Sequence, residues 1–196
     1  MTAADKITSV RLFLAPLFFV VYLLPVWAPV WFINGSQWTV PVLWVLFVVS
    51  EITDLIDGQV ARERKEVSDF GKLFDPFADV LVRITYFLCF VVDGILPVVL
   101  LLVVLYREFG IQFLRVLMMK KGVAMGARKG GKLKAVAYMA AGLLALLAAS
   151  VERLGLEAAL YSGLRLGAII VFLVSVLISV VSFADYMVVY RRTGAE

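Results

Sequence analysis

The chain has 196 residues, of which 63% are hydrophobic and 17% are charged, and its formal net charge is +4. Soluble domains carry a smaller apolar fraction, so the composition excludes an ordinary soluble enzyme and predicts an all-α, polytopic membrane protein forming one domain over residues 1–196. The sequence has no histidine and one cysteine, which excludes imidazole metal ligands, histidine general bases and a disulfide framework. Carboxylates are therefore the expected acid–base groups, and the modest positive charge favours contact with anionic lipid over nucleic-acid binding.

Six transmembrane helices are expected along the chain. Residues 12–50 contain no charged side chain, and because one span needs about 20 residues, this run predicts two helices. Proline, glycine and asparagine residues between positions 25 and 41 mark the break between them. The six spans are predicted at residues 11–32, 40–62, 72–92, 95–119, 132–151 and 162–190.

An even number of crossings places both termini on the same side of the membrane. Of the 19 Lys and Arg residues, only Arg153 and Arg165 fall near the opposite side in this topology. The positive-inside rule therefore predicts a multi-pass protein of the cell (inner) membrane with both termini in the cytoplasm. The helices are expected to surround a polar cavity that opens toward the cytoplasm.

Four aspartates form the most polar feature at the predicted cytoplasmic end of the second and third spans. Asp54 and Asp57 are three residues apart, and Asp75 and Asp79 are four apart, so each pair shares one face of a helix. The polar turn at residues 63–68 would fold the two helices back to back and bring the carboxylates together. Four such groups cannot stay ionised unpaired in a low-dielectric cavity. Hard divalent cations with oxygen ligands, Mg²⁺ or Mn²⁺, are the simplest remedy.

Small residues and one arginine accompany the aspartates. Gly58 and Ala61 lie one turn beyond the first pair, and Gly71 lies one turn before Asp75. Their small side chains would leave room for a ring or a phosphate beside the metal site. Arg62 is placed to meet a phosphate group. The alternative, a cluster of solvated acids on a loop, is disfavoured because membrane segments flank the run and ionisable residues there are usually functional.

A second polar cluster is basic. Arg107 and Arg115 are eight residues apart, so they are expected to line one face of the fourth helix and to point into the bundle. Glu108 follows Arg107 directly and is expected to face elsewhere, which would make it a poor partner for both. Together with Lys132 and Lys134, the two arginines therefore predict a pocket for a phosphorylated acceptor. The alternative is contact of these long side chains with lipid headgroups.

The pattern D-x2-D-G-x2-A-R-x8-G-x3-D-x3-D, at residues 54–79, resembles the signature of the CDP-alcohol phosphotransferases, and every fixed position is matched. The resemblance implies a metal-dependent enzyme that displaces CMP from a CDP-linked molecule with the hydroxyl of an alcohol. It implies that the four aspartates hold two divalent cations and that Asp79 also deprotonates the attacking hydroxyl. The donor-binding residues implied are Thr8, Arg11, Asp54, Gly58, Ala61, Arg62 and Gly71.

Further motifs resemble the phosphatidylglycerophosphate synthases of this family. They are I-T-x-x-R at residues 7–11, D-P-x-A-D at 75–79, R-E-x6-R at 107–115 and G-K-x-K at 131–134. This resemblance implies CDP-diacylglycerol as donor and glycerol 3-phosphate as acceptor, giving phosphatidylglycerophosphate and CMP in phospholipid biosynthesis. The family also implies a homodimer. The acceptor phosphate would be bound by Arg107, Arg115, Lys132 and Lys134.

One departure leaves the acceptor open. The synthases usually continue with lysine after D-P-x-A-D, whereas this chain has Val80. Arg83, four residues beyond Asp79, is expected to supply the missing charge on the same face. Other acceptors therefore remain as alternatives, as in phosphatidylinositol phosphate synthase or enzymes of the phosphatidylserine and choline type. A small cation transporter is a remote alternative, disfavoured because the acids gather at one membrane face rather than at the midplane.

Overall fold

The computed structural model describes residues 3–29, 36–64, 69–120, 122 and 129–193. Within these ranges, the side chains of residues 3–5, 55, 57–64, 69–70, 72, 129–132, 189 and 192–193 are outside the description. The described chain forms six α-helices: α1 (Ala3–Trp27), α2 (Thr39–Arg64), α3 (Asp69–Val92), α4 (Val98–Lys120), α5 (Lys129–Arg153) and α6 (Ala158–Thr193).

The six helices confirm the predicted all-α class, but several ends differ from the prediction. Helix α1 begins at Ala3 rather than near residue 11, and α6 continues to Thr193. Charged residues mark only where apolar sequence ends, and a helix can extend beyond the hydrocarbon region. Helix α1 also ends earlier than predicted, at Trp27, two residues before Pro29. Proline disfavours the helical conformation in the residue that precedes it.

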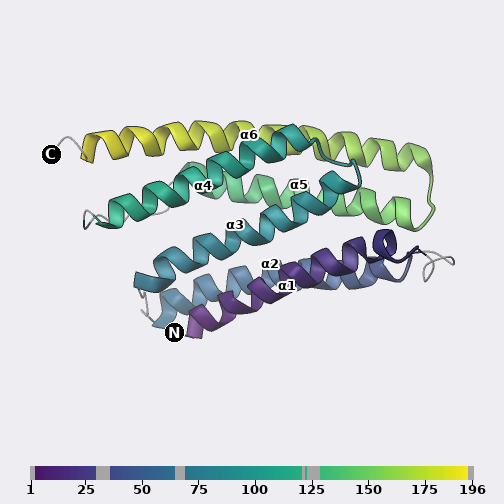
Figure 1. Ribbon diagram of the computed structural model, residues 1–196, viewed down its shortest axis with the longest axis horizontal. Coiled ribbons are helices and arrows are strands. Elements are labelled where there is room, and N and C mark those ends of the chain that lie inside the picture. Colours follow the sequence, from purple (N-terminus) through teal and green to yellow (C-terminus); the bar gives the residue numbers. More distant parts are fainter. Residues whose placement is uncertain (1–2, 30–35, 65–68, 121, 123–128, 194–196) are drawn as a thin grey trace.

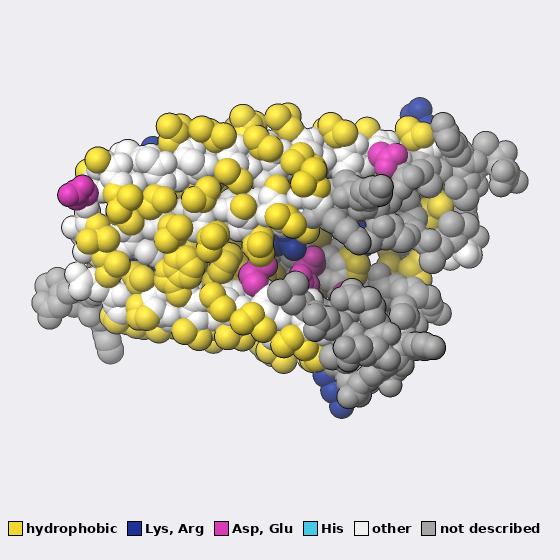
Figure 2. Space-filling model, turned by 180° about the vertical axis from the view of Figure 1, so that it is seen from behind, with side chains coloured by type: hydrophobic (Ala, Val, Ile, Leu, Met, Phe, Trp, Pro, Cys, Tyr) yellow, Lys and Arg dark blue, Asp and Glu magenta, His cyan; other side chains and the backbone are white. Residues whose placement is uncertain are grey.

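Membrane character is visible in both composition and surface. In the described part of the chain, three helices contain segments long and apolar enough to cross a membrane: Lys6–Trp27, Leu133–Arg153 and Ala158–Val188. Hydrophobic side chains cover much of the visible face in Figure 2. The chain is therefore a membrane protein, and its described part is built of six helices.

The helices form a bundle in which α3 is central. Helix α1 packs against α2 and α3, α5 packs along α6, and α4 contacts α3 and α6 (Figure 1). The start of α1 and the end of α6 lie at the same end of the bundle, as do the end of α2 and the start of α3. Residues near these helix ends are thereby gathered at one end of the molecule.

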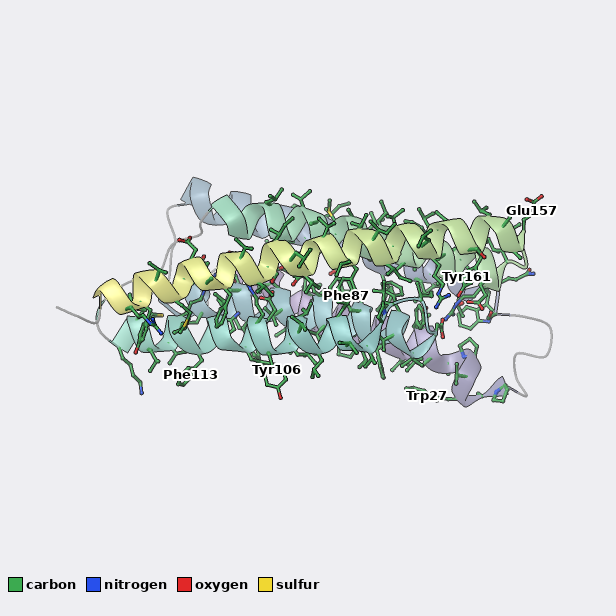
Figure 3. The ribbon with its side chains drawn as sticks, turned by 90° about the horizontal axis from the view of Figure 1, so that it is seen from above. Trp27, Phe87, Tyr106, Phe113, Glu157 and Tyr161 are labelled. Atoms are coloured by element: carbon green, nitrogen blue, oxygen red, sulfur yellow. The ribbon has the colours of Figure 1, made fainter. Side chains whose placement is uncertain are left out.

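Aromatic packing around α3 explains its central place. The ring of Tyr86 lies 4.5 Å from that of Phe18 in α1, and the ring of Phe87 lies 4.6 Å from that of Phe172 in α6. Phe87 is seen within the bundle in Figure 3. Adjacent residues of α3 thus bury side chains against opposite halves of the protein. Asp79 precedes Tyr86 by seven residues, or about two turns, so the same packing turns Asp79 toward α1 and α2.

The opposite end of the bundle is closed by an ion-pair network and tight turns. Tyr22 donates a hydrogen bond to Asp93 at 2.6 Å, and Arg153 lies 3.5 Å from the same carboxylate. Arg153 also donates to Thr39 at 2.9 Å. Gly94, two residues beyond the end of α3, has a φ of 70°, a conformation that suits glycine. These contacts join α1, α2, α3 and α5 at the end remote from Asp54, Asp75 and Asp79.

Candidate active site

Arg11 joins the carboxylates of two helices. Its Nη1 atom donates to Asp54 of α2 and to Asp79 of α3, the latter at 2.9 Å. Only 2% of the arginine side chain is exposed, whereas about a third of each aspartate side chain remains accessible, 34% and 35%. The guanidinium therefore balances two carboxylates that keep an open side, and α1 orients both.

Thr8 performs a similar task one turn earlier in α1. Its Oγ1 atom donates to Asp75 Oδ1 at 2.8 Å, and the residue is fully buried. Thr8 and Arg11 are three residues apart and face α3 together. Thr8, Arg11, Asp54, Asp75 and Asp79 are thus brought together, as the sequence predicts. Both residues lie inside α1, both are buried, and both are bonded to aspartates.

Part of the predicted site lies outside the described side chains. This applies to Asp57, Gly58, Ala61 and Arg62, whose backbone belongs to α2, and to Lys132, whose backbone belongs to α5. Gly71 is described, is buried, and precedes Asp75 by one turn of α3.

The aspartates fit a site for hard divalent cations. No group of three Asp, Glu or Cys side chains among the described residues is placed to hold a metal ion, and Asp57 of the predicted set is not among them. Asp54 and Asp79 nevertheless accept hydrogen bonds from a single nitrogen atom. Their oxygens therefore lie within two hydrogen-bond lengths of each other, around one positive charge. An all-carboxylate donor set with an open side suits Mg²⁺ or Mn²⁺.

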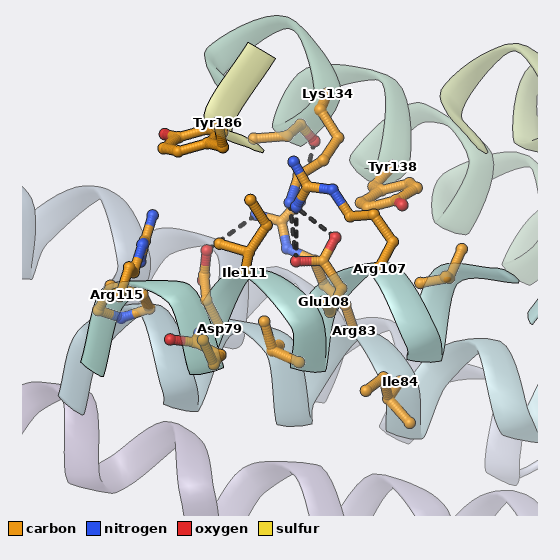
Figure 4. A pocket seen from close by; sticks show the side chains of 15 residues that line it. Asp79, Arg83, Ile84, Arg107, Glu108, Ile111, Arg115, Lys134, Tyr138 and Tyr186 are labelled. Carbon is orange, nitrogen blue, oxygen red and sulfur yellow. Dashed lines mark hydrogen bonds and ion pairs between the residues drawn. The ribbon is translucent and has the colours of Figure 1, made fainter. Parts of the chain in front are cut away.

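A cavity of about 210 Å³ begins at Asp79 and extends between α3, α4, α5 and α6 (Figure 4). The charged residues that line it are Asp79, Arg83, Arg107, Glu108, Arg115 and Lys134. Apolar and aromatic residues such as Ile111 and Tyr138 complete its wall. The described members of the basic cluster, Arg107, Arg115 and Lys134, therefore share one cavity with Asp79.

Arg83 links the aspartate to the wall of this cavity. Its Nη2 atom lies 3.4 Å from Asp79 Oδ2, and its Nη1 atom donates to the backbone oxygen of Ala135 at 3.1 Å. The prediction that Arg83 shares a face with Asp79 is confirmed. Because Arg11 bonds the other oxygen of Asp79, both carboxylate oxygens have a cationic partner and the orientation of the group is set from two sides.

The expectation that Glu108 is a poor partner for Arg107 is wrong. Arg107 Nη1 donates to Glu108 Oε2 at 2.9 Å, although the two residues are adjacent in α4. Adjacent positions do point in different directions on a helix, but both side chains are long enough to reach the same cavity. Arg107 also donates from Nε to the backbone oxygen of Ser179 at 3.0 Å and from Nη2 to Ser182 Oγ at 3.4 Å. This arginine therefore ties α4 to α6.

Lys134 and Arg115 complete the basic wall. Lys134 Nζ lies 2.7 Å and 3.0 Å from the two oxygens of Glu108, which joins α5 to α4. Arg115 lines the same cavity, and its Nε atom is buried without a hydrogen-bond partner among the described residues. A buried donor that lacks a partner favours an anionic ligand at this place. The two arginines do line one face of α4, as predicted.

Sequence reasoning assigned no role to Glu108. An acidic residue inside an apolar helix between two arginines is a signal in itself, because such residues in membrane helices are usually paired and functional. Its partner Lys134 lies 26 residues further along the chain, and that contact cannot be inferred from spacing within one helix.

Comparison with known proteins places the chain in a family. A family model described as CDP-alcohol phosphatidyltransferase matches residues 1–181. The chain is 38% identical over 190 residues to the CDP-diacylglycerol–glycerol-3-phosphate 3-phosphatidyltransferase of Treponema pallidum (strain Nichols), which covers 95% of this chain and 88% of that protein. It is 31% identical over 142 residues to the Bacillus subtilis (strain 168) enzyme of the same name, covering 70% and 72% of the two chains.

A third relative is a probable phosphatidylglycerophosphate synthase of Mycobacterium tuberculosis, 29% identical over 187 residues, with 94% of this chain and 79% of that protein covered. The match to the family model spans nearly the whole chain, including all four aspartates and the charged residues that line the cavity. The chain belongs to the CDP-alcohol phosphatidyltransferase family and is a membrane transferase.

Proposed function

We propose that this chain transfers a phosphatidyl group from CDP-diacylglycerol to glycerol 3-phosphate, giving phosphatidylglycerophosphate and CMP for phospholipid biosynthesis. The observation that carries the proposal is the cavity in which Asp79 faces Arg83, Arg115 and Lys134. A carboxylate beside several cations suits a small molecule with a hydroxyl at one end and a phosphate at the other. The names of the relatives support the same donor and acceptor.

The aspartates form the donor side of the proposed site. Two Mg²⁺ or Mn²⁺ ions would be held by Asp54, Asp57, Asp75 and Asp79. When bound, these ions would neutralise the negative charge of the donor diphosphate and of the leaving CMP. Thr8 and Arg11 orient the carboxylates through the hydrogen bonds described above. Gly58, Ala61 and Gly71 would leave space for the nucleotide, and Arg62 would meet its phosphates.

Asp79 is the proposed general base. Its carboxylate would take the proton of the acceptor hydroxyl while that oxygen forms a bond to the phosphatidyl phosphorus and the bond to the CMP oxygen breaks. Its contacts with Arg11 and Arg83 keep both oxygens oriented. The phosphate of the acceptor would be bound by Arg107, Arg115, Lys132 and Lys134.

The membrane arrangement belongs to the same proposal. All six helices would cross the cell (inner) membrane as one domain, with the termini and the cavity facing the cytoplasm. The start of α1 and the end of α6 lie at one end of the bundle, which supports an even number of crossings (Figure 1). A water-soluble acceptor would then enter from the cytoplasm and the lipid donor from the bilayer. A homodimer is proposed from the family alone.

An acceptor panel tests the proposal. Purified protein in vesicles containing CDP-diacylglycerol and Mg²⁺ is offered glycerol 3-phosphate, inositol phosphate, serine or glycerol separately, and CMP release is measured. We expect glycerol 3-phosphate to give the highest kcat/KM and unphosphorylated glycerol to give little turnover. A preference for inositol phosphate or for serine would contradict the proposed acceptor but would retain the reaction class.

A further inference from the structure

Glu108 is a buried acid at the centre of the basic cavity. Only 6% of its side chain is exposed, and it lines the cavity together with Arg107 and Lys134 (Figure 4). Both of its oxygens accept hydrogen bonds from Lys134, and Oε2 also accepts one from Arg107. A carboxylate this deep inside a membrane helix needs such partners. It lines the same cavity as Asp79, the proposed general base, which gives it a relation to the acceptor.

The contacts of Glu108 join three helices. It lies on α4, Lys134 lies on α5, and Arg107 continues the chain of hydrogen bonds to Ser179 and Ser182 on α6. A lysine ammonium is a point charge on a flexible stem that adopts many rotamers. Two bonds of 2.7 Å and 3.0 Å to Glu108 hold the ammonium at one place in the cavity. Fixing a ligand-binding group beforehand lowers the entropy lost when the ligand binds.

Glu108 also sets the charge of the cavity. Among the described side chains that line it, Arg83, Arg107, Arg115 and Lys134 are positive, and Asp79 and Glu108 are negative. Four positive and two negative charges leave two positive charges in excess. A phosphate monoester carries about 1.5 to 2 negative charges at neutral pH. With Glu108 in place, the described side chains therefore still carry an excess of positive charge that suits one such group.

We propose that Glu108 is a positioning residue for acceptor binding, which holds the Lys134 ammonium in the cavity and links it through Arg107 to α6. The proposal rests on the proposed function, because it takes a phosphorylated alcohol as the acceptor. Glu108 acts through Lys134 rather than by contact with the reacting atoms. Its loss therefore weakens acceptor binding more than it slows the chemical step.

The test compares Glu108→Gln with the wild-type enzyme. The amide keeps the shape of the side chain but loses its charge. We expect the KM for glycerol 3-phosphate to rise about tenfold to a hundredfold, the range that corresponds to losing a hydrogen bond between charged groups. The kcat at saturating acceptor and the KM for CDP-diacylglycerol should change less than threefold. An acceptor KM that is unchanged or lower would overturn the proposal.

A double-mutant cycle with Lys134→Met tests whether Glu108 acts through Lys134. Glu108→Gln should then add little to the rise in acceptor KM already caused by Lys134→Met. Independent, multiplicative effects of the two substitutions would overturn the proposal. If Glu108→Gln does not fold, Glu108→Asp, which keeps the charge but shortens the reach, replaces it in the same cycle with the same criterion.

Asp93→Asn is the matched control. Like Glu108, Asp93 is a carboxylate with polar partners in other helices. Its partners are Tyr22 and Arg153, and it lies at the opposite end of the bundle. We expect it to lower the thermal midpoint without changing the acceptor KM. An equal rise in acceptor KM in Asp93→Asn would show that any lost ion pair has this effect and would overturn the proposal. If the wild-type enzyme prefers a different phosphorylated alcohol, the proposed function fails, and the same cycle with that acceptor still tests the role of Glu108.

Discussion

Replacement of Arg11 tests the link between the first helix and the aspartates. Arg11→Met removes a buried guanidinium that bonds Asp54 and Asp79 and leaves both carboxylates without that cation. Loss of one partner of a fully buried pair costs about 3–5 kcal/mol. About a third of each aspartate side chain is exposed, 34% and 35%, and screening by solvent reduces the expected cost to about 1–2 kcal/mol. For a protein of this size the thermal midpoint would fall by about 2–8 °C.

The assay is the thermal midpoint of purified protein in detergent, measured with EDTA and with Mg²⁺. Divalent cations at the aspartates would replace part of the lost positive charge, so Mg²⁺ should raise the midpoint of Arg11→Met more than that of the wild-type protein. Arg11→Lys is the control, because a single ammonium keeps the charge but does not reproduce the planar, multiple-donor geometry of the guanidinium. An unchanged midpoint in Arg11→Met, or no difference between EDTA and Mg²⁺, would refute this reasoning.

Three further predictions concern the cavity and the core. Asp79→Asn should lower kcat by about 10²–10⁴-fold, the usual contribution of a general base. The thermal midpoint of the variant should show that the protein is still folded. Near-normal turnover would remove Asp79 from the role of general base. Arg115→Met should raise the acceptor KM about tenfold or more. The control Lys120→Met, at an exposed position of α4, should leave the acceptor KM unaltered. Equal effects of the two substitutions would contradict a specific contact between Arg115 and the acceptor. Phe87→Ala should destabilise the protein by about 3–5 kcal/mol, as for other buried aromatic residues. Phe113 is exposed, so Phe113→Ala should have little effect on stability (Figure 3). Similar thermal midpoints for the two variants would argue against α3 as the centre of the core.

Much of the fold could be predicted because the membrane imposes strong rules on sequence. A charge-free run of residues 12–50 favours two long apolar helices joined by a turn. The described part of the chain has six helices, of which three contain segments apolar enough to cross a membrane. The ends of α1 and α6 were misplaced because a change in polarity shows where apolar surface ends, not where helical hydrogen bonding ends. Backbone hydrogen bonds continue through polar sequence until a residue such as Pro29 disfavours them.

The candidate site could be predicted where its residues share a helix. A spacing of four residues correctly placed Asp79 and Arg83 on one face, and a spacing of eight placed Arg107 and Arg115 at one cavity. Contacts between helices could not be derived in this way. The bond from Arg11 to Asp79 crosses 68 residues of sequence, and the partners of Glu108 depend on how α4 and α5 pack. The rule that adjacent residues of a helix do not face each other failed at Arg107 and Glu108. It considers the direction of the Cα–Cβ bond and ignores the length of the side chain.

The most direct test of the account is the stoichiometry of transfer. Wild-type protein in vesicles containing CDP-diacylglycerol and Mg²⁺ is given radiolabelled glycerol 3-phosphate, and labelled lipid and free CMP are measured in the same sample. The account predicts one labelled phosphatidylglycerophosphate for each CMP released, and neither product when EDTA is present. Release of CMP without label in the lipid, or transfer that persists in EDTA, would contradict it.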